Sequence, residues 1–165
     1  MDTPQDRLIR SLQDAHAAEV GIAQMLESCI KEVEDNNLRA IFQQHLAVTW
    51  SQAQRLEKRL NDFGQTPSRA KGYVNSLLAG LGDMAHAGHD AYDRTTMALI
   101  KAYATEHLEI GIYSALAGYA QALGDQPTAS LAEEIAEEER KAAGVLFPYI
   151  RNSAGTPLGR ALQAL

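Results

Sequence analysis

The sequence contains a single cysteine, Cys29, and no apolar run that approaches the ~20 residues needed to cross a bilayer. One cysteine excludes a disulfide framework within the chain, and its helical spacing from Ile22 and Leu26 favours a small core residue over a reactive thiol. The first residues lack the charged-then-apolar layout of a secretory signal. We therefore expect a cytoplasmic protein that has no membrane partner.

Basic residues are also few. The sequence has 15 Lys and Arg and 21 Asp and Glu, which gives a net charge of −6. They are dispersed rather than gathered in one block, so nucleic acid is not an expected partner. β-branched residues are scattered whereas alanine is frequent, which favours helix over sheet. A chain of 165 residues with 45% apolar side chains is long enough for one domain with a sizeable core.

Apolar residues recur at steps of three and four in four long segments, which is the pattern of amphipathic helices. The predicted helices cover about residues 6–33, 38–63, 94–123 and 127–149. Gly64 and Gly124 are placed to end the second and third helices, and Pro148 is expected to bend or end the fourth.

The helical pattern weakens between Ser68 and Asp93, where Tyr73–Leu81 suggests a short helix. A connection of this length is too long for neighbouring antiparallel helices, but it would carry the chain from one end of a bundle to the other. We therefore predict an all-α fold, a ferritin-like four-helix bundle of residues 1–151 with a long crossover between its second and third helices. Residues 152–165 are expected to form a tail that is either a short amphipathic helix or disordered.

Glutamates occupy positions on these helices where the apolar stripe should continue. Glu19 lies in the first helix, Glu106 and Glu109 share one face of the third, and either Glu138 or Glu139 faces inward in the fourth. Burying several ionised carboxylates together is costly without countercharge, and two divalent cations would cancel four such charges. Oxygen-rich ligands with imidazole favour iron or manganese for redox work.

The second helix offers His45 on its inward stripe but no acid there. Bundles that hold two metal ions use a Glu and a His three residues apart on two helices, and that motif is absent. A two-metal site would therefore be incomplete, and a single ion held by Glu19, Glu106, Glu109 and His45 is easier to support. The alternative is ion pairing of the acids at the surface, with Arg55, Arg59, Arg140 and Lys141.

Six segments carry a family resemblance: D-A-H-A-A-E at 14–19, F-Q-Q-H-L-A-V-T at 42–49, Q-x-x-R-L-E at 52–57, F-G-Q-T-P at 63–67, E-H-L-E-I-G-I-Y at 106–113 and E-E-E-R at 137–140. Over about residues 6–150 the chain resembles the bacterial YciE/YciF-type family of ferritin-like stress proteins.

The resemblance implies a ferritin-like fold and a homodimer. It also implies metal-ligand or near-ligand positions for Glu19, Glu106, Glu109 and one of Glu138 or Glu139. The chain departs from the family pattern at Val48, where members usually carry an acid.

Two hypotheses follow. The first is a metal-binding, stress-related protein whose di-metal site is partly degenerate and whose one or two ions meet a small oxidant such as peroxide or oxygen. The second is a non-catalytic dimeric bundle, a stress or scaffold protein that has lost metal binding and has no cofactor. Enzymatic activity is open between them.

Overall fold

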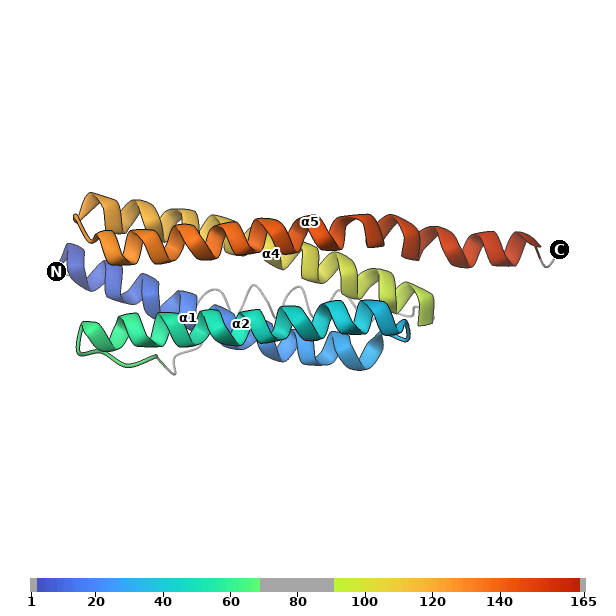
Figure 1. Ribbon diagram of the computed structural model, residues 1–165, viewed down its shortest axis with the longest axis horizontal. Helices are drawn as coiled ribbons and strands as arrows, with labels where there is room; N and C mark the ends of the chain where they lie inside the picture. The colour runs from blue at the N-terminus through green and yellow to red at the C-terminus, as the bar shows by residue number, and fades with distance from the viewer. Residues whose placement is uncertain (1–2, 69–90, 164–165) are drawn as a thin grey trace.

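The computed structural model describes residues 3–68 and 91–163, with side chains over 3–68 and 94–155. This part of the chain forms four helices: α1 (Pro4–Glu32), α2 (Asn36–Asp62), α4 (Ala91–Ala122) and α5 (Gln126–Gln163). α1 packs against α2 and α4, and α5 packs against α4 and α2, so each helix has two neighbours. Neighbouring helices run antiparallel (Figure 1). Within the described residues, no helix is long and apolar enough to span a membrane.

The predicted all-α bundle is confirmed, and its connections follow the predicted order. The end of α2 and the start of α4 lie at opposite ends of the bundle, as a long crossover between them requires (Figure 1). α4 begins at Ala91, before the predicted start, and the short helix predicted at 73–81 lies outside the described residues.

Local chemistry fixes where the helices begin and end. The Thr3 hydroxyl accepts a hydrogen bond from the backbone N–H of Asp6 at 3.1 Å, and the Asp6 carboxylate accepts one from the N–H of Thr3 at 2.9 Å. Asp35 caps α2 by accepting from two backbone N–H groups. Gly64 and Gly124 have φ angles of +67° and +71°, a left-handed conformation that glycine adopts without strain and that ends a helix.

Arg59 joins the last turn of α2 to the turn between α4 and α5. Its guanidinium donates to the Asp125 carboxylate at 2.8 and 2.9 Å and to the Thr128 hydroxyl at 2.7 Å. The same group lies 4.4 Å from the centre of the Phe63 ring. Because Arg59 and Asp125 are both largely shielded from water, this pair fixes α2 against α5 at one end of the bundle.

Two apolar clusters fill the bundle, one on each side of its middle, and all four helices contribute to both. The first cluster includes Leu12, Leu56, Leu116 and Ile135. The second includes Ile22, Phe42, Leu99 and Leu146. Where the two clusters meet, every helix contributes at least one buried polar side chain, so a polar layer crosses the middle of an otherwise apolar core.

Pro148 does not end the last helix, so of the two outcomes expected from the sequence, a bend or an end, the second does not occur. α5 continues through Pro148 to Gln163, and residue 151 therefore lies inside a helix rather than at its end. Beyond the proline, Tyr149 and Ile150 pack against the second apolar cluster, and the Thr96 hydroxyl donates to Ser153 at 3.0 Å. These contacts with α4 offset the one hydrogen bond that proline removes. The division of the chain at residue 151 stays a prediction.

Replacing Pro148 with alanine should stabilise the protein. Pro148 is exposed and lies in a helix interior, where proline is less favourable than alanine by about 3 kcal/mol. We expect Pro148→Ala to raise the midpoint of urea unfolding, with a gain of up to this size. Arg151→Ala, an exposed change one turn later, should leave the midpoint nearly unchanged. A lowered midpoint for Pro148→Ala would show that the proline itself shapes the packing of α5 on α4.

Candidate metal centre

The polar layer consists mainly of acidic side chains with almost no access to solvent. Glu19 of α1, Glu106 and Glu109 of α4 and Glu139 of α5 are each 0–1% exposed, and His45 of α2 is 8% exposed. Each continues the inward stripe of its helix, so the packing of the flanking apolar residues carries these groups into the bundle. Four carboxyl groups and one imidazole therefore share one buried layer.

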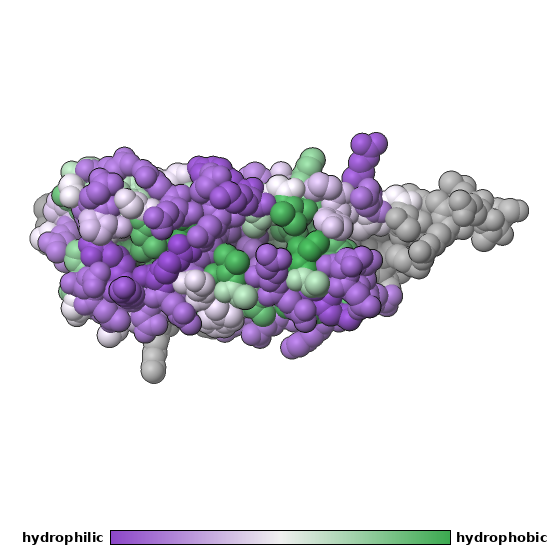
Figure 2. Space-filling view, viewed as in Figure 1, coloured by the Kyte–Doolittle hydropathy of each residue, from purple (hydrophilic) through white to green (hydrophobic). Residues whose placement is uncertain are grey.

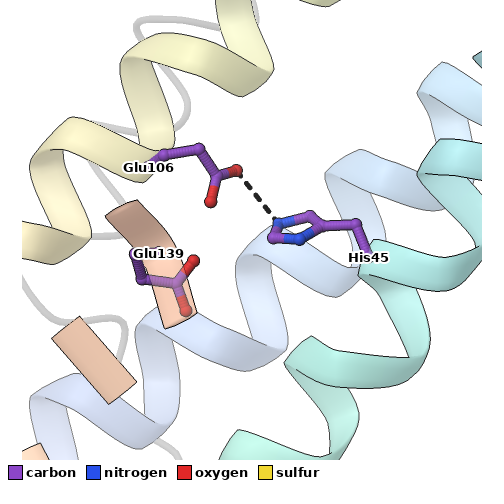
Figure 3. A group of neighbouring side chains, drawn as sticks. All are labelled: His45, Glu106 and Glu139. Atoms are coloured by element: carbon purple, nitrogen blue, oxygen red, sulfur yellow. Dashed lines mark ion pairs between the residues drawn. The ribbon is translucent and has the colours of Figure 1, made fainter. Parts of the chain in front are cut away.

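These side chains form two adjacent groups that have one member in common. His45, Glu106 and Glu139 each offer a ligand atom within 4.8 Å of the others, and Glu19, Glu109 and Glu139 do the same. Figure 3 shows the first group, in which His45 and Glu106 point toward each other and Glu139 lies beside them. The shared Glu139 places one carboxylate between two candidate ion positions.

Several atoms of the cluster lack the partners that burial normally requires. Among the described residues, one oxygen of Glu19, one of Glu109, both of Glu106 and Nε2 of His45 are buried without a hydrogen bond. Nε2 of His45 lies 3.0 Å from an oxygen of Glu106, close enough for an ion pair but not aligned as a hydrogen bond. Buried polar atoms without partners are rare in proteins because each costs desolvation energy. A set of unpaired carboxylate oxygens and an imidazole nitrogen is a donor set that fits divalent cations.

Burial also controls the protonation of the cluster. It raises the pKa of Glu19 to about 8, of Glu106 to about 7 and of Glu139 to about 9, and it raises the pKa of Glu109 well above its ordinary value of 4.5. Mutual repulsion of the carboxylates adds to this effect. Burial lowers the pKa of His45, so its imidazole is neutral and has a lone pair to offer. Without a cation, the carboxyl groups hold protons near neutral pH.

Other side chains orient the acids from outside the two groups. The Tyr113 hydroxyl donates to Glu19, and the Gln52 amide donates to Glu139 and, at 3.0 Å, to Glu138. The role of Gln52 was missed in the sequence analysis. Its signal was its place on the inward stripe of the second helix, because a polar side chain there needs a partner in the core.

The sequence left open whether Glu138 or Glu139 faces the core, and the structure buries Glu139. Glu139 belongs to both groups, whereas Glu138 is 34% exposed and meets Arg55. The set of Glu19, Glu106, Glu109 and His45 suggested for a single ion is divided between the two groups. Of the arginines expected to neutralise the acids, Arg55 pairs with Glu138, as expected, but the other two have different partners. Arg59 pairs with Asp62 and Asp125, and Arg140 pairs with Glu137.

Comparisons with known proteins agree with this architecture. Residues 3–155 match the family model of a domain of unknown function, DUF892. The chain is 25% identical over 142 residues to protein YciF of Escherichia coli K12, covering 85% of this chain and 86% of that protein. The crystal structure of the E. coli stress protein YciF superposes with a TM-score of 0.83 over 94% of this chain and 99% of the other.

Two further solved structures extend the comparison. A protein from Xanthomonas campestris pv. campestris is 27% identical, with a TM-score of 0.80 over 97% of this chain and 99% of that one. A structure of ferritin-like, diiron-carboxylate proteins from Bacillus anthracis is 17% identical, with a TM-score of 0.68 over 91% and 99% of the two chains. At that identity the likeness concerns the fold, which is therefore ferritin-like, as the sequence predicted.

The metal-free protein should lose stability as the pH rises. The unfolded chain releases the cluster protons near pH 4.5, whereas the folded protein holds those of Glu106, Glu19 and Glu139 up to about pH 7, 8 and 9. The stability present below pH 4.5 therefore declines through this range, by about 1.4 kcal/mol per pKa unit and group. Urea unfolding from pH 5 to pH 9 in the presence of a chelator measures the decline.

Glu139→Gln provides the control, because an amide at this position removes one titrating group and should make the decline smaller. Stability that increases with pH over the same range would contradict the raised pKa values.

Proposed function

This chain belongs to the DUF892 family, and we propose that it is a carboxylate-type metal-binding protein that holds one or two divalent ions in the middle of its bundle. The observation that carries the proposal is the pair of buried groups that share Glu139 and include unpaired oxygens. Cations would replace the protons of the carboxyl groups and satisfy the unpaired atoms together. The presence of YciF, named a stress protein, among the relatives supports a stress-related role.

The two groups differ in ligand type, which bears on the ions they would hold. His45, Glu106 and Glu139 supply one nitrogen and oxygens, whereas Glu19, Glu109 and Glu139 supply oxygens alone. Iron suits the mixed set and manganese suits the all-oxygen set, since imidazole ligands favour iron over harder cations. Such ions would supply a redox-active, Lewis-acidic position for a small oxidant such as peroxide or oxygen.

The protein residues around the groups have definable tasks in this proposal. Tyr113 holds Glu19 through its hydroxyl, and Gln52 holds Glu139 through its amide, so each keeps one carboxylate in position before an ion arrives. The apolar clusters on either side exclude water, which strengthens every electrostatic interaction within the layer. The neutral imidazole of His45 needs to release no proton in order to bind.

A second candidate function is a bundle that has lost metal binding. It is favoured by Gln52 and Val48, because the second helix presents an amide and an apolar side chain but no acid on this side of the bundle. With raised pKa values the carboxyl groups can also remain protonated and neutral. The two functions differ in one measurable property, which is the metal content of the purified protein.

A comparison of substitutions at Glu139 and at its sequence neighbour Glu138 tests the proposal. We expect protein purified without chelator and supplied with Fe²⁺ or Mn²⁺ to bind stoichiometric metal by elemental analysis. Glu139→Gln should lose nearly all of it, because this carboxylate belongs to both groups. Glu138→Gln removes the same charge one residue away, outside both groups, and should retain the metal. Absence of metal from the wild type, or equal retention by both variants, would favour the metal-free bundle.

Substitutions in only one group should remove only one ion. His45→Ala affects the mixed group and Glu19→Gln the all-oxygen group, so each variant is expected to keep about half of the wild-type metal content if two ions bind. Titration followed by elemental analysis gives the stoichiometry. Complete loss in both variants would instead indicate that the groups act together on a single ion.

Self-association and location form the remaining part of the proposal. We infer a homodimer from the family resemblance, and the cytoplasmic location stays a prediction. Exposed apolar side chains such as Trp50, Tyr119 and Phe147 provide surface that pairing could cover.

A further inference from the structure

The bundle is least closely packed where α2 meets α5. These two helices approach each other less closely than the other neighbouring pairs. A groove of about 590 Å³ lies between them. Binding sites for small molecules in proteins have volumes of about 300–1,000 Å³, so this groove has the size of such a site.

The groove is built from one face of each helix, at helical spacing. Its lining residues are Ile41, Gln44, His45, Val48, Ser51 and Arg55 of α2 and Glu138, Lys141, Ala142, Val145 and Leu146 of α5. Apolar side chains lie toward one end, and Arg55, Glu138 and Lys141 gather toward the other. Val48 and Val145 are 36% and 50% exposed, so the groove presents aliphatic surface to solvent. Figure 2 shows apolar patches along the middle of this face, surrounded by hydrophilic residues.

His45 connects the groove with the buried layer. It lines the groove and also belongs to the group with Glu106 and Glu139, with its Nε2 3.0 Å from a Glu106 oxygen. Of the five cluster residues it is the most exposed, at 8%. A molecule in the groove would therefore lie against the one residue that the surface and the cluster share.

The charges of the groove indicate what kind of molecule fits it. Two lining residues are basic, Arg55 and Lys141, and one is acidic, Glu138, while Glu134 lies 3.9 Å from Arg55 just outside the lining. Arg55 is shared by Glu134 and Glu138, which leaves the exposed Lys141 as the cation for an anionic group. The apolar residues from Ile41 to Leu146 offer a surface for a hydrocarbon body.

We propose that the groove between α2 and α5 binds a small amphipathic carboxylate, a hydrocarbon chain with one acidic group, next to His45 at the edge of the metal centre. Because the ligand would lie beside the cluster, it could act in the proposed metal chemistry. This part of the inference rests on the proposed function. The groove itself is present in the metal-free protein.

Decanoate serves as the probe, with decanol as its uncharged counterpart. Isothermal titration of the metal-free full chain should give saturable decanoate binding at or below about 1 mM. Val48→Trp and Val145→Trp fill the groove from its two helices and should weaken binding about tenfold or more. Both positions are partly exposed, so a larger side chain should not prevent folding. Leu123→Trp adds the same ring at an exposed site outside the groove and should leave binding unchanged.

Charge and metal provide two further comparisons. Lys141→Gln should weaken the binding of decanoate but not that of decanol, because it removes the cation without filling the groove. Glu139→Gln should lose metal yet keep decanoate, so a failure of the metal proposal remains distinguishable from a failure of this one. If His45 connects the two sites, decanoate should also change the metal affinity of the wild type.

Three outcomes would overturn the inference. The first is the absence of saturable binding. The second is binding that the groove variants and Leu123→Trp affect equally. The third is a groove covered by a second copy of the chain, shown by a dimer that Val145→Glu dissociates and Leu123→Glu does not.

Discussion

The burial of four carboxyl groups in one layer is the constraint on which this structure depends. Each group loses its hydration and lies beside others of the same charge, so the layer is tolerable only if protons or cations neutralise it. Protons neutralise the charge and turn carboxyl groups into donors that neighbouring carboxyl oxygens accept. Cations neutralise the same charge and also take a lone pair from His45, and this property connects the electrostatics of the bundle with its proposed function.

The apolar clusters on either side fix the positions of the side chains in this layer. Side chains such as Leu56 and Leu116 on one side and Phe42 and Leu99 on the other fix the helices above and below it. The groups in between need little adjustment to face one another, because the flanking packing sets the rotation of each helix. The looser contact of α2 with α5 is the exception, and it leaves His45 as the residue through which the layer approaches the surface.

Much of the fold could be predicted because its signals are local. Thr3, Asp35, Gly64 and Gly124 act within a few residues of themselves, and the apolar periodicity reports a helix wherever it occurs. Pro148 shows the limit of this kind of signal. Its local effect is to break a helix, but α5 is held beyond it by contacts with α4, and no local pattern encodes those contacts.

The sequence by itself determined that acids occupy the inward stripes of three helices and that a histidine occupies the fourth, since helical period alone decides which face a residue joins. Only the tertiary structure decided that Glu139 rather than Glu138 enters the layer, that it lies between two groups, and that Gln52 holds it. Adjacent residues on a helix differ by about 100° in direction, so the rotation of α5 about its axis decides which of the two faces the layer. That rotation is set by packing among helices far apart in the sequence.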